Sequence, residues 1–256
     1  MKISVTLTLI ILWCSFVLAF FVFAKGVDKN TMAIWMFDET KGDTVEDLSG
    51  RGHNLKVEGS HKWVAGKFGN ALYFTQSAFV EYKSHPDLSF EDGMTIEFWL
   101  NLEDITPQNV VGIPRKESEY VVAAYEQGNG FYMGPWINNG AWVGPLKSTV
   151  VSPYGEWHHH AVTYDGKELK VYVDGKSTGS MKIAGPMNKT DAPFRISNSC
   201  CGGRFFVGAL DEMRISNIPR TEAEIKELLE RGLASILAVE AANGLSITWG
   251  RIKSGN

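Results

Sequence analysis

Residues 156–175 read EWHHHAVTYDGKELKVYVDG and contain the clearest β-hairpin of the chain. Two short apolar runs, at residues 158–164 and 169–173, are joined through Asp165-Gly166, a dipeptide typical of tight hairpin turns. Another such dipeptide, Asp174-Gly175, follows the second run and indicates a further turn. The stretch therefore predicts antiparallel strands that are connected by very short loops.

The same pattern of short runs separated by turn residues extends along the chain from Thr31 onward. In residues 94–100, Ile96, Phe98 and Leu100 recur at every second position, as one face of a strand requires. Strands at this spacing, without helices between them, predict an all-β fold, a two-sheet antiparallel sandwich of the jelly-roll type. Further strands are predicted at residues 33–37, 71–74, 78–82, 120–125, 131–133, 141–143, 205–210 and 212–215.

The composition agrees with a β-rich globular domain. The 26 glycines and the aromatic content of 12% favour strands and tight turns. The length of 256 residues suffices for one sizeable domain with small attachments. The formal charge of −4, with no basic stripe in the sequence, argues against nucleic acid as a partner.

The first 24 residues form a separate segment. One lysine precedes a run without charged residues from Ile3 to Ala24, and Val22 and Ala24 occupy positions −3 and −1 of a cleavage site before Lys25. We expect a signal peptide at residues 1–24. A membrane anchor at residues 3–24 is the alternative, since about 20 apolar residues can span a bilayer. Either way the remainder is expected to be secreted, periplasmic or on the cell surface, with membrane contact only if the segment is retained.

After this segment the chain contains two cysteines, the neighbours Cys200 and Cys201. Thiols outside the cytoplasm tend to oxidise, and these two have no other partner in the exported part. A vicinal disulfide and two free buried thiols both fit the sequence. A catalytic cysteine and a zinc site are disfavoured, because the surrounding sequence shows neither a protease-type Cys–His arrangement nor enough further ligands.

One helix is predicted, near the C-terminus. Thr221 and Glu224 form a capping box, and Gly232 ends the helix. The chain therefore divides into a linker at residues 25–30, a jelly-roll domain at 31–219, a closing helix at 220–233 and a tail at 234–256. In the tail we expect a short terminal hairpin around Asn243-Gly244. The apolar face of the helix consists of Ile225, Leu228 and Leu229.

Seven segments of this chain together resemble laminin G-like jelly-roll domains of the concanavalin A-like lectin/glucanase superfamily. The resemblance covers roughly residues 31–230 and implies two packed antiparallel sheets. The fold hosts lectins, adhesion modules and glycosidases, so the resemblance indicates the fold more strongly than the function. In chain order, the segments are residues 35–39 (WMFDE), 47–54 (DLSGRGHN), 66–72 (GKFGNAL), 95–99 (TIEFW), 156–166, 169–175 and 208–214 (GALDEMR).

The resemblance also implies a structural calcium ion near the point where the first and last strands meet. The matching residues are Asp38, Asp47, Asn54 and Asp211. Their oxygen atoms suit Ca²⁺, a hard cation that takes several oxygen ligands from separate segments. The alternatives are a turn-capping role for Asp47 and solvated strand ends for Asp38 and Asp211.

The sequence offers little for catalysis. Glycosidases need paired carboxyl groups about 5–9 Å apart, and Asp211 and Glu212 are adjacent, so we expect them to face opposite sides of a strand. His158 and His160 can share a face, but we favour a core or sheet-face role over a metal site. We therefore predict that the protein is not an enzyme.

A binding role rests on aromatic and amide side chains between residues 131 and 142. Sugars stack on aromatic rings and form hydrogen bonds with amides, as in a lectin groove. The alternative is that Trp136 and Trp142 fill the sandwich core. The predicted ligand-binding residues are Tyr132, Trp136, Asn138, Asn139 and Trp142.

These features together predict an exported, non-catalytic recognition module that binds carbohydrate at a cell surface or in an extracellular matrix. A protein–protein adhesion or structural module, with a cell-surface or matrix protein as its partner, is the second hypothesis. A glycoside hydrolase with carboxylates dispersed in the sequence is the third.

Overall fold

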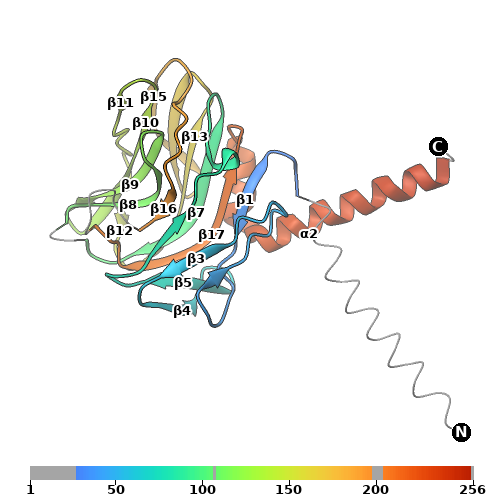
Figure 1. The fold of residues 1–256 in the computed structure, drawn as a ribbon, viewed down its shortest axis with the longest axis horizontal. Helices are drawn as coiled ribbons and strands as arrows, with labels where there is room; N and C mark the ends of the chain where they lie inside the picture. The colour runs from blue at the N-terminus through green and yellow to red at the C-terminus, as the bar shows by residue number, and fades with distance from the viewer. Residues whose placement is uncertain (1–26, 106–107, 198–203, 255–256) are drawn as a thin grey trace, which may run out of the picture.

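The computed structural model describes residues 27–105, 108–197 and 204–254 (Figure 1). The predicted signal or anchor at residues 1–24 and the Cys200–Cys201 pair lie outside these ranges. Among the described residues, no helix combines the length and the hydropathy that a membrane span requires.

The described strands form two antiparallel sheets that pack face to face, which confirms the predicted jelly-roll sandwich (Figure 1). Sheet I has the order β15-β14-β13-β7-β17-β5-β4, with β1 beside β17. Its strands are β1 (Thr31–Trp35), β4 (His61–Ala65), β5 (Asn70–Phe74), β7 (Met94–Leu102), β13 (Trp157–Tyr164), β14 (Glu168–Val173), β15 (Lys176–Lys182) and β17 (Gly208–Ser216).

Sheet II has the order β11-β10-β9-β8-β16-β6-β3-β2, with β12 beside β10. A short 3-10 helix, η2 (Pro86–Leu88), and one long helix, α2 (Glu222–Ser254), complete the described elements. The strands of sheet II are β2 (Thr44–Val45), β3 (Leu55–Glu58), β6 (Phe79–Tyr82), β8 (Val110–Lys116), β9 (Tyr120–Gln127), β10 (Gly130–Asn138), β11 (Trp142–Val143), β12 (Ser152–Pro153) and β16 (Phe194–Ile196).

The hairpin predicted at residues 156–175 is present. β13 pairs with β14 in antiparallel register, with Tyr164 opposite Leu169 across the Asp165-Gly166 turn. Asp174 and Gly175 both have positive φ, 48° and 72°, as a two-residue hairpin turn requires, and they lead directly into β15. The turn chemistry of this stretch thus fixes three neighbouring strands of sheet I.

The main core lies between the two sheets. Ile96, Phe98 and Leu100 of β7 are fully buried there, as their alternation predicts. From β1 and β16, the rings of Trp35 and Phe194 stack across the core with their centroids 5.7 Å apart. Each large side chain buried in this way contributes about 1.5–3 kcal/mol to stability, so the sandwich has a substantial driving force.

The first part of α2 covers the outer face of sheet I. Leu228 and Ile236 pack against Trp99 and other residues of that face, and Ile225 packs against Ala161 and Tyr172. The predicted capping box is present, because Glu224 Oε2 accepts a hydrogen bond from the Thr221 amide at 2.8 Å. The apolar contacts of α2 go to sheet I, so this helix leaves the outer face of sheet II uncovered.

The predicted terminal hairpin is wrong. Gly232 interrupts the helix with φ 68° and ψ 165°, but the chain then resumes a helical conformation as far as Ser254 and extends beyond the sandwich (Figure 1). Leu233, Ile236 and Leu237 explain why the helix resumes after Gly232, since they bury their side chains against sheet I at helical spacing. Asn243 and Gly244 lie further along the same helix and form no turn.

The contact between α2 and sheet I gives a stability prediction. Leu228 is fully buried in it, so we expect Leu228→Ala to lower the free energy of unfolding by about 2–5 kcal/mol in a guanidinium titration. The exposed neighbour Glu230 provides the control, and Glu230→Ala should change the value by less than about 0.5 kcal/mol. Equal effects of the two substitutions would contradict the proposed packing of the helix.

Candidate functional site

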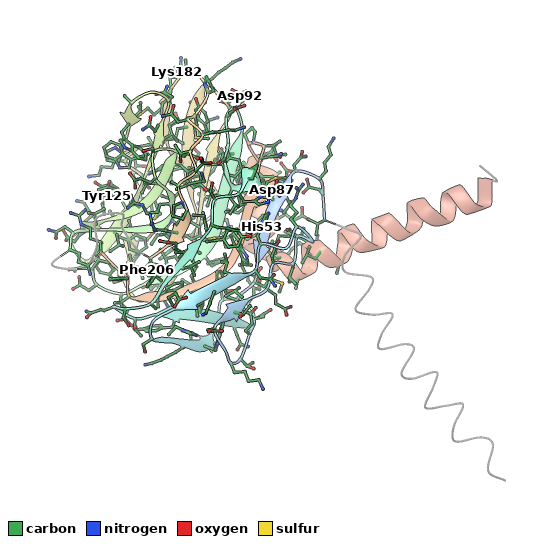
Figure 2. The ribbon with its side chains drawn as sticks, in the orientation of Figure 1. His53, Asp87, Asp92, Tyr125, Lys182 and Phe206 are labelled. Atoms are coloured by element: carbon green, nitrogen blue, oxygen red, sulfur yellow. The ribbon has the colours of Figure 1, made fainter. Side chains whose placement is uncertain are left out.

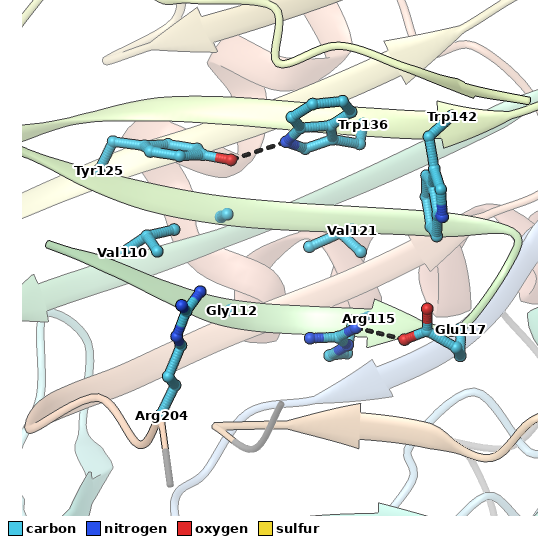
Figure 3. A pocket seen from close by; sticks show the side chains of 10 residues that line it. Val110, Gly112, Arg115, Glu117, Val121, Tyr125, Trp136, Trp142 and Arg204 are labelled. Atoms are coloured by element: carbon cyan, nitrogen blue, oxygen red, sulfur yellow. Dashed lines mark hydrogen bonds and ion pairs between the residues drawn. The ribbon is translucent and has the colours of Figure 1, made fainter. Parts of the chain in front are cut away.

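The predicted aromatic residues lie on the outer face of sheet II (Figure 3). Trp136 is half-buried on β10, and Trp142 on β11 exposes 38% of its surface. Tyr132, also on β10, is half-buried as well. The core positions of β10 belong instead to Phe131, Met133 and Ile137. Burial of Trp136 and Trp142 in the sandwich core is therefore excluded.

The register of β8, β9 and β10 produces a hollow on this face. Gly112, Ala123 and Gly134 lie side by side across the three strands, with the Tyr125 ring over Gly134 and the Arg115 side chain beside Gly112. One neighbouring row contains Val110, Tyr125 and Tyr132, and the other contains Arg115, Val121 and Trp136. With Trp142, Glu117 and Arg204 at its edges, the hollow has a volume of about 330 Å³ (Figure 3).

The rings around the hollow are held in fixed positions. Trp136 Nε1 donates a hydrogen bond to the hydroxyl of Tyr125 at 2.7 Å, and the Tyr125 ring stacks on Tyr132 at 5.2 Å. A side chain at Gly134 would clash with the Tyr125 ring, since a Cβ there would lie 2.6 Å from Cε2. Burial raises the pKa of Tyr125, so its hydroxyl stays protonated and can donate a hydrogen bond to a ligand.

Charged groups line the β8 side of the hollow. Arg115 Nη2 forms an ion pair with Glu117 Oε2, while the buried Nε of Arg115 has no hydrogen-bond partner. Arg204, from the segment before β17, reaches toward the floor from the same side (Figure 3). The outward alternation of Val121, Ala123 and Tyr125 could have identified Tyr125 from the sequence, whereas no local pattern pointed to the two arginines.

Asn138 and Asn139 do not face the hollow. Asn138 exposes only 8% of its surface, and its Oδ1 accepts a hydrogen bond from Asn188 Nδ2 at 2.8 Å. Asn139 Nδ2 donates to the carbonyl of Ala184 at 3.1 Å. Both amides thus anchor the β10–β11 turn to the segment at residues 184–188, which corrects the expectation that they contribute to the same groove as the rings.

Asp38 and Asp211 both bind the turn at residues 66–70. Asp211 Oδ2 accepts hydrogen bonds from the amides of Lys67 and Phe68, at 2.8 and 3.0 Å. Asp38 Oδ1 accepts one from the amide of Asn70 at 2.8 Å. These bonds join the end of β1 and the middle of β17 through one turn.

The strands predicted at residues 205–210 and 212–215 are replaced by one strand, β17, that contains a β-bulge. Asp211 pairs with Trp99 and Arg214 with Glu97, so β17 has one extra residue between these pairs. Glu212 lies in the bulge with φ 53°, and its Oε2 accepts a hydrogen bond from the amide of Leu233 in α2. The bulge corrects the expectation that Asp211 and Glu212 face opposite sides, because simple alternation fails there.

The bulge creates a buried acidic cluster. Burial is the main cause that raises the pKa of Asp211 to about 8 and that of Glu212 to about 7, and the nearby negative charges, Glu212 and Asp38 for Asp211 and Asp38 for Glu212, contribute to these values. Asp211 Oδ1 and Glu212 Oε1 are buried without a hydrogen-bond partner. These two oxygen atoms are of the type that a hard cation binds, but in the described residues the carboxylates of Asp38, Asp211 and Glu212 do not form a set of ligand atoms within 4.8 Å of one another.

Asp47 and Asn54 form a different group. Asn54 Oδ1 accepts a hydrogen bond from the Asp47 amide at 2.9 Å. The Asp47 carboxylate accepts bonds from the amides of Ile34, Ser49 and His53, at 3.1, 2.9 and 2.9 Å. Asp47 thus has the turn-capping role that was its alternative. In the described residues, no hydrogen bond connects this pair to Asp38 or Asp211.

Two groups of histidines were further candidates for metal ligands, and the contacts of both favour a structural role. His159 and His160 are buried, and burial lowers the pKa of each to about 3, so both are neutral core residues, as the sequence favoured. His53 and Asp87 lie together near β1 (Figure 2), with His85 nitrogen within 4.8 Å of their ligand atoms. Arg51 Nη1 lies 3.2 Å from Asp87 Oδ2 and already neutralises that carboxylate, which disfavours a metal ion there.

Comparison with known proteins places this architecture among characterised domains. A laminin G-type family model described as "Concanavalin A-like lectin/glucanases superfamily" matches residues 74–226. Pappalysin-1 of Mus musculus is 29% identical over 112 residues, which cover 40% of this chain and 7% of the relative. The chain therefore spans a small part of the length of this curated relative.

Solved structures with the same fold include three binding or accessory domains. Domain 4 of AbnA, a GH43 extracellular arabinanase from Geobacillus stearothermophilus in complex with arabinotriose, has a TM-score of 0.65 and 19% identity over 78% of this chain and 98% of that chain. The binding domain of Paraclostridial Mosquitocidal Protein 1 has a TM-score of 0.62 and 14% identity, over 78% of this chain and 52% of that chain. The binding domain of Botulinum Neurotoxin DC in complex with SialylT has a TM-score of 0.59 and 12% identity, over 79% of this chain and 51% of that chain. At these identities the likeness shows the fold alone.

The turn at residues 66–70 gives a matched pair of glycine predictions. Gly69 and Gly42 both have positive φ, 58° and 83°, but a Cβ on Gly69 would overlap Asp38 Oδ1, whereas Gly42 has open space. We expect Gly42→Ala to cost about 1–2 kcal/mol of unfolding free energy from backbone strain alone. Gly69→Ala should cost clearly more in the same guanidinium titration, and equal costs would show that Asp38 does not hold this turn.

Proposed function

The chain belongs to the laminin G-like family of the concanavalin A-like lectin/glucanase superfamily, and from this premise we propose that it is an exported, non-catalytic module that binds carbohydrate at a cell surface or in an extracellular matrix. The observation that carries the proposal is the aromatic hollow on the uncovered face of sheet II. Export rests on the apolar segment at residues 1–24, which we propose is a signal peptide.

The hollow has the properties that sugar binding requires. Flat rings of Tyr125, Trp136 and Trp142 line the hollow, so a pyranose or furanose ring can place its C–H face on an indole. The Tyr125 hydroxyl accepts its hydrogen bond from Trp136 and keeps its own proton for a sugar hydroxyl. Because these rings hold one another in place, little side-chain entropy is lost on binding.

Two of the similar structures are complexes, one with arabinotriose and one with SialylT, and they support carbohydrate as the ligand class. The non-catalytic part of the proposal rests on the carboxylates. Glu117 at the hollow is paired with Arg115, and the Asp211–Glu212 cluster is buried beneath α2. Neither group offers two accessible carboxyl groups about 5–9 Å apart on either side of a substrate.

We also propose a structural calcium ion at the acidic cluster, held by Asp38, Asp211 and Glu212. The unpartnered oxygens of Asp211 and Glu212 support it, because a divalent cation would compensate their buried charge. Asp47 and Asn54 are not included among the proposed ligands, because their side-chain oxygens already accept hydrogen bonds from backbone amides. The ion would stabilise the junction of β1, β17 and α2, and takes no part in sugar binding.

Substitution of the exposed indole tests the proposed sugar site. We expect Trp142→Ala to weaken binding to the best ligand on a glycan array about tenfold in isothermal titration, because one stacking surface is lost. Tyr73→Ala provides the control, since Tyr73 is a half-buried aromatic residue on sheet I, and it should bind as the unmodified protein does. Absence of binding to every glycan, with calcium present, would instead favour a protein partner.

The calcium proposal makes a prediction about pH. The folded-state pKa values of Asp211 and Glu212, about 8 and 7, lie above the ordinary 3.8 and 4.5, so with chelator the folded state binds more protons. Thermal stability should then fall as the pH rises from about 4 to about 8. Millimolar calcium binds the ionised carboxylates and should raise the melting temperature more at about pH 8 than at about pH 5.

The matched variants for this experiment are Asp211→Asn and Glu230→Gln. Asp211→Asn should remove most of the pH dependence and the response to calcium, whereas Glu230→Gln, at an exposed site on α2, should retain both. A melting temperature that is insensitive to millimolar calcium at about pH 8 would rule out the ion.

A further inference from the structure

The hollow on sheet II carries a positive charge although the chain as a whole has a formal charge of −4. Two arginines line it, Arg115 and Arg204, against one carboxylate, Glu117, that is already paired with Arg115. In the described part of the chain, no ion pair joins Arg204 to an acidic residue. The site therefore has one uncompensated positive charge beside its aromatic rings.

Arg115 has unused hydrogen-bonding capacity. Its side chain is only 11% exposed, its Nη2 is bonded to Glu117, and its buried Nε has no acceptor. A guanidinium group cannot lose its proton in a protein, so this N–H must find an acceptor or pay the cost of an unmade hydrogen bond. The Arg115 side chain also lines the hollow, where its other guanidinium N–H groups can donate to an oxygen atom of a ligand.

Arg204 brings the second charge from a different segment. Its side chain is exposed and lines the same hollow as Tyr125. Figure 3 shows both arginines on the β8 side of the hollow, with Tyr125 and Trp136 on the β10 side. The hollow thus has a cationic edge and an aromatic edge.

From this arrangement we infer that the hollow selects acidic glycans, with a carboxylate or sulfate group of the sugar bound between Arg115 and Arg204 and its ring against Trp136 and Trp142. The inference rests on the proposed function and narrows it to a ligand class. Guanidinium groups bind both anions through paired hydrogen bonds, and these are about twice as strong as bonds between neutral groups. A neutral sugar would leave the charge of Arg204 without a partner.

The test is an array in which each acidic glycan is printed beside its neutral form: sialylated beside desialylated, uronate beside methyl ester, and sulfated beside desulfated. We expect the protein to prefer the acidic member, and titration of the best pair to show about tenfold tighter binding that weakens with added salt. The sialylated and uronate pairs distinguish a carboxylate from a sulfate as the group recognised.

Arg204→Gln is the decisive variant, because Arg204 is exposed and its loss leaves the fold intact. It should abolish the acidic preference, so that the acidic and neutral members of each pair bind equally. Arg231→Gln makes the same charge change on the exposed surface of α2 and should preserve the preference.

Three other outcomes overturn the inference. Equal binding of acidic and neutral glycans, or equal losses for both in Arg204→Gln, would reject the acidic selectivity and leave carbohydrate binding standing. If no glycan of either kind binds, the proposed function itself fails and the inference fails with it.

Discussion

Asp211 and Glu212 place two carboxyl groups inside the molecule, at a bulge that three separate segments depend on. Asp211 accepts hydrogen bonds from two amides of the turn at residues 66–70. Glu212 accepts one from the amide of Leu233, where α2 resumes after Gly232. The bulge thereby aligns β17 with β1 and directs the helix along sheet I. Buried carboxyl groups are costly unless they are protonated or compensated, so we expect the stability of this junction to depend on pH.

The position of the helix decides which face of the sandwich can bind a ligand. α2 buries Ile34, Trp99 and their neighbours on sheet I, and that face is lost as a binding surface. The outer face of sheet II has the row of Gly112, Ala123 and Gly134 between larger residues. The acidic junction and the proposed binding site therefore lie on different sheets. A ligand on sheet II can bind without disturbing the acidic junction on the other side.

The hollow combines preorganised rings with groups that the fold leaves unsatisfied. Tyr125, Tyr132 and Trp136 fix one another through stacking and a hydrogen bond, which supports shape recognition. The Nε of Arg115 and the charge of Arg204 are compensated by nothing around them in the described residues. Both guanidinium groups line the hollow, so an anionic ligand group there would meet N–H donors from two separate segments.

The sequence by itself determined the sandwich, because alternation and turn dipeptides such as Asp165-Gly166 act over a few residues and fix strands, turns and register locally. The sequence also singled out Trp136 and Trp142, but it could not decide whether their side chains point into the core or to the surface. That depends on which face of β10 packs against sheet I. Tertiary structure alone decided the helical tail, the bulge at Glu212 and the placement of Arg115 and Arg204 around the same hollow. Each of these depends on contacts between distant segments, and no local pattern records them.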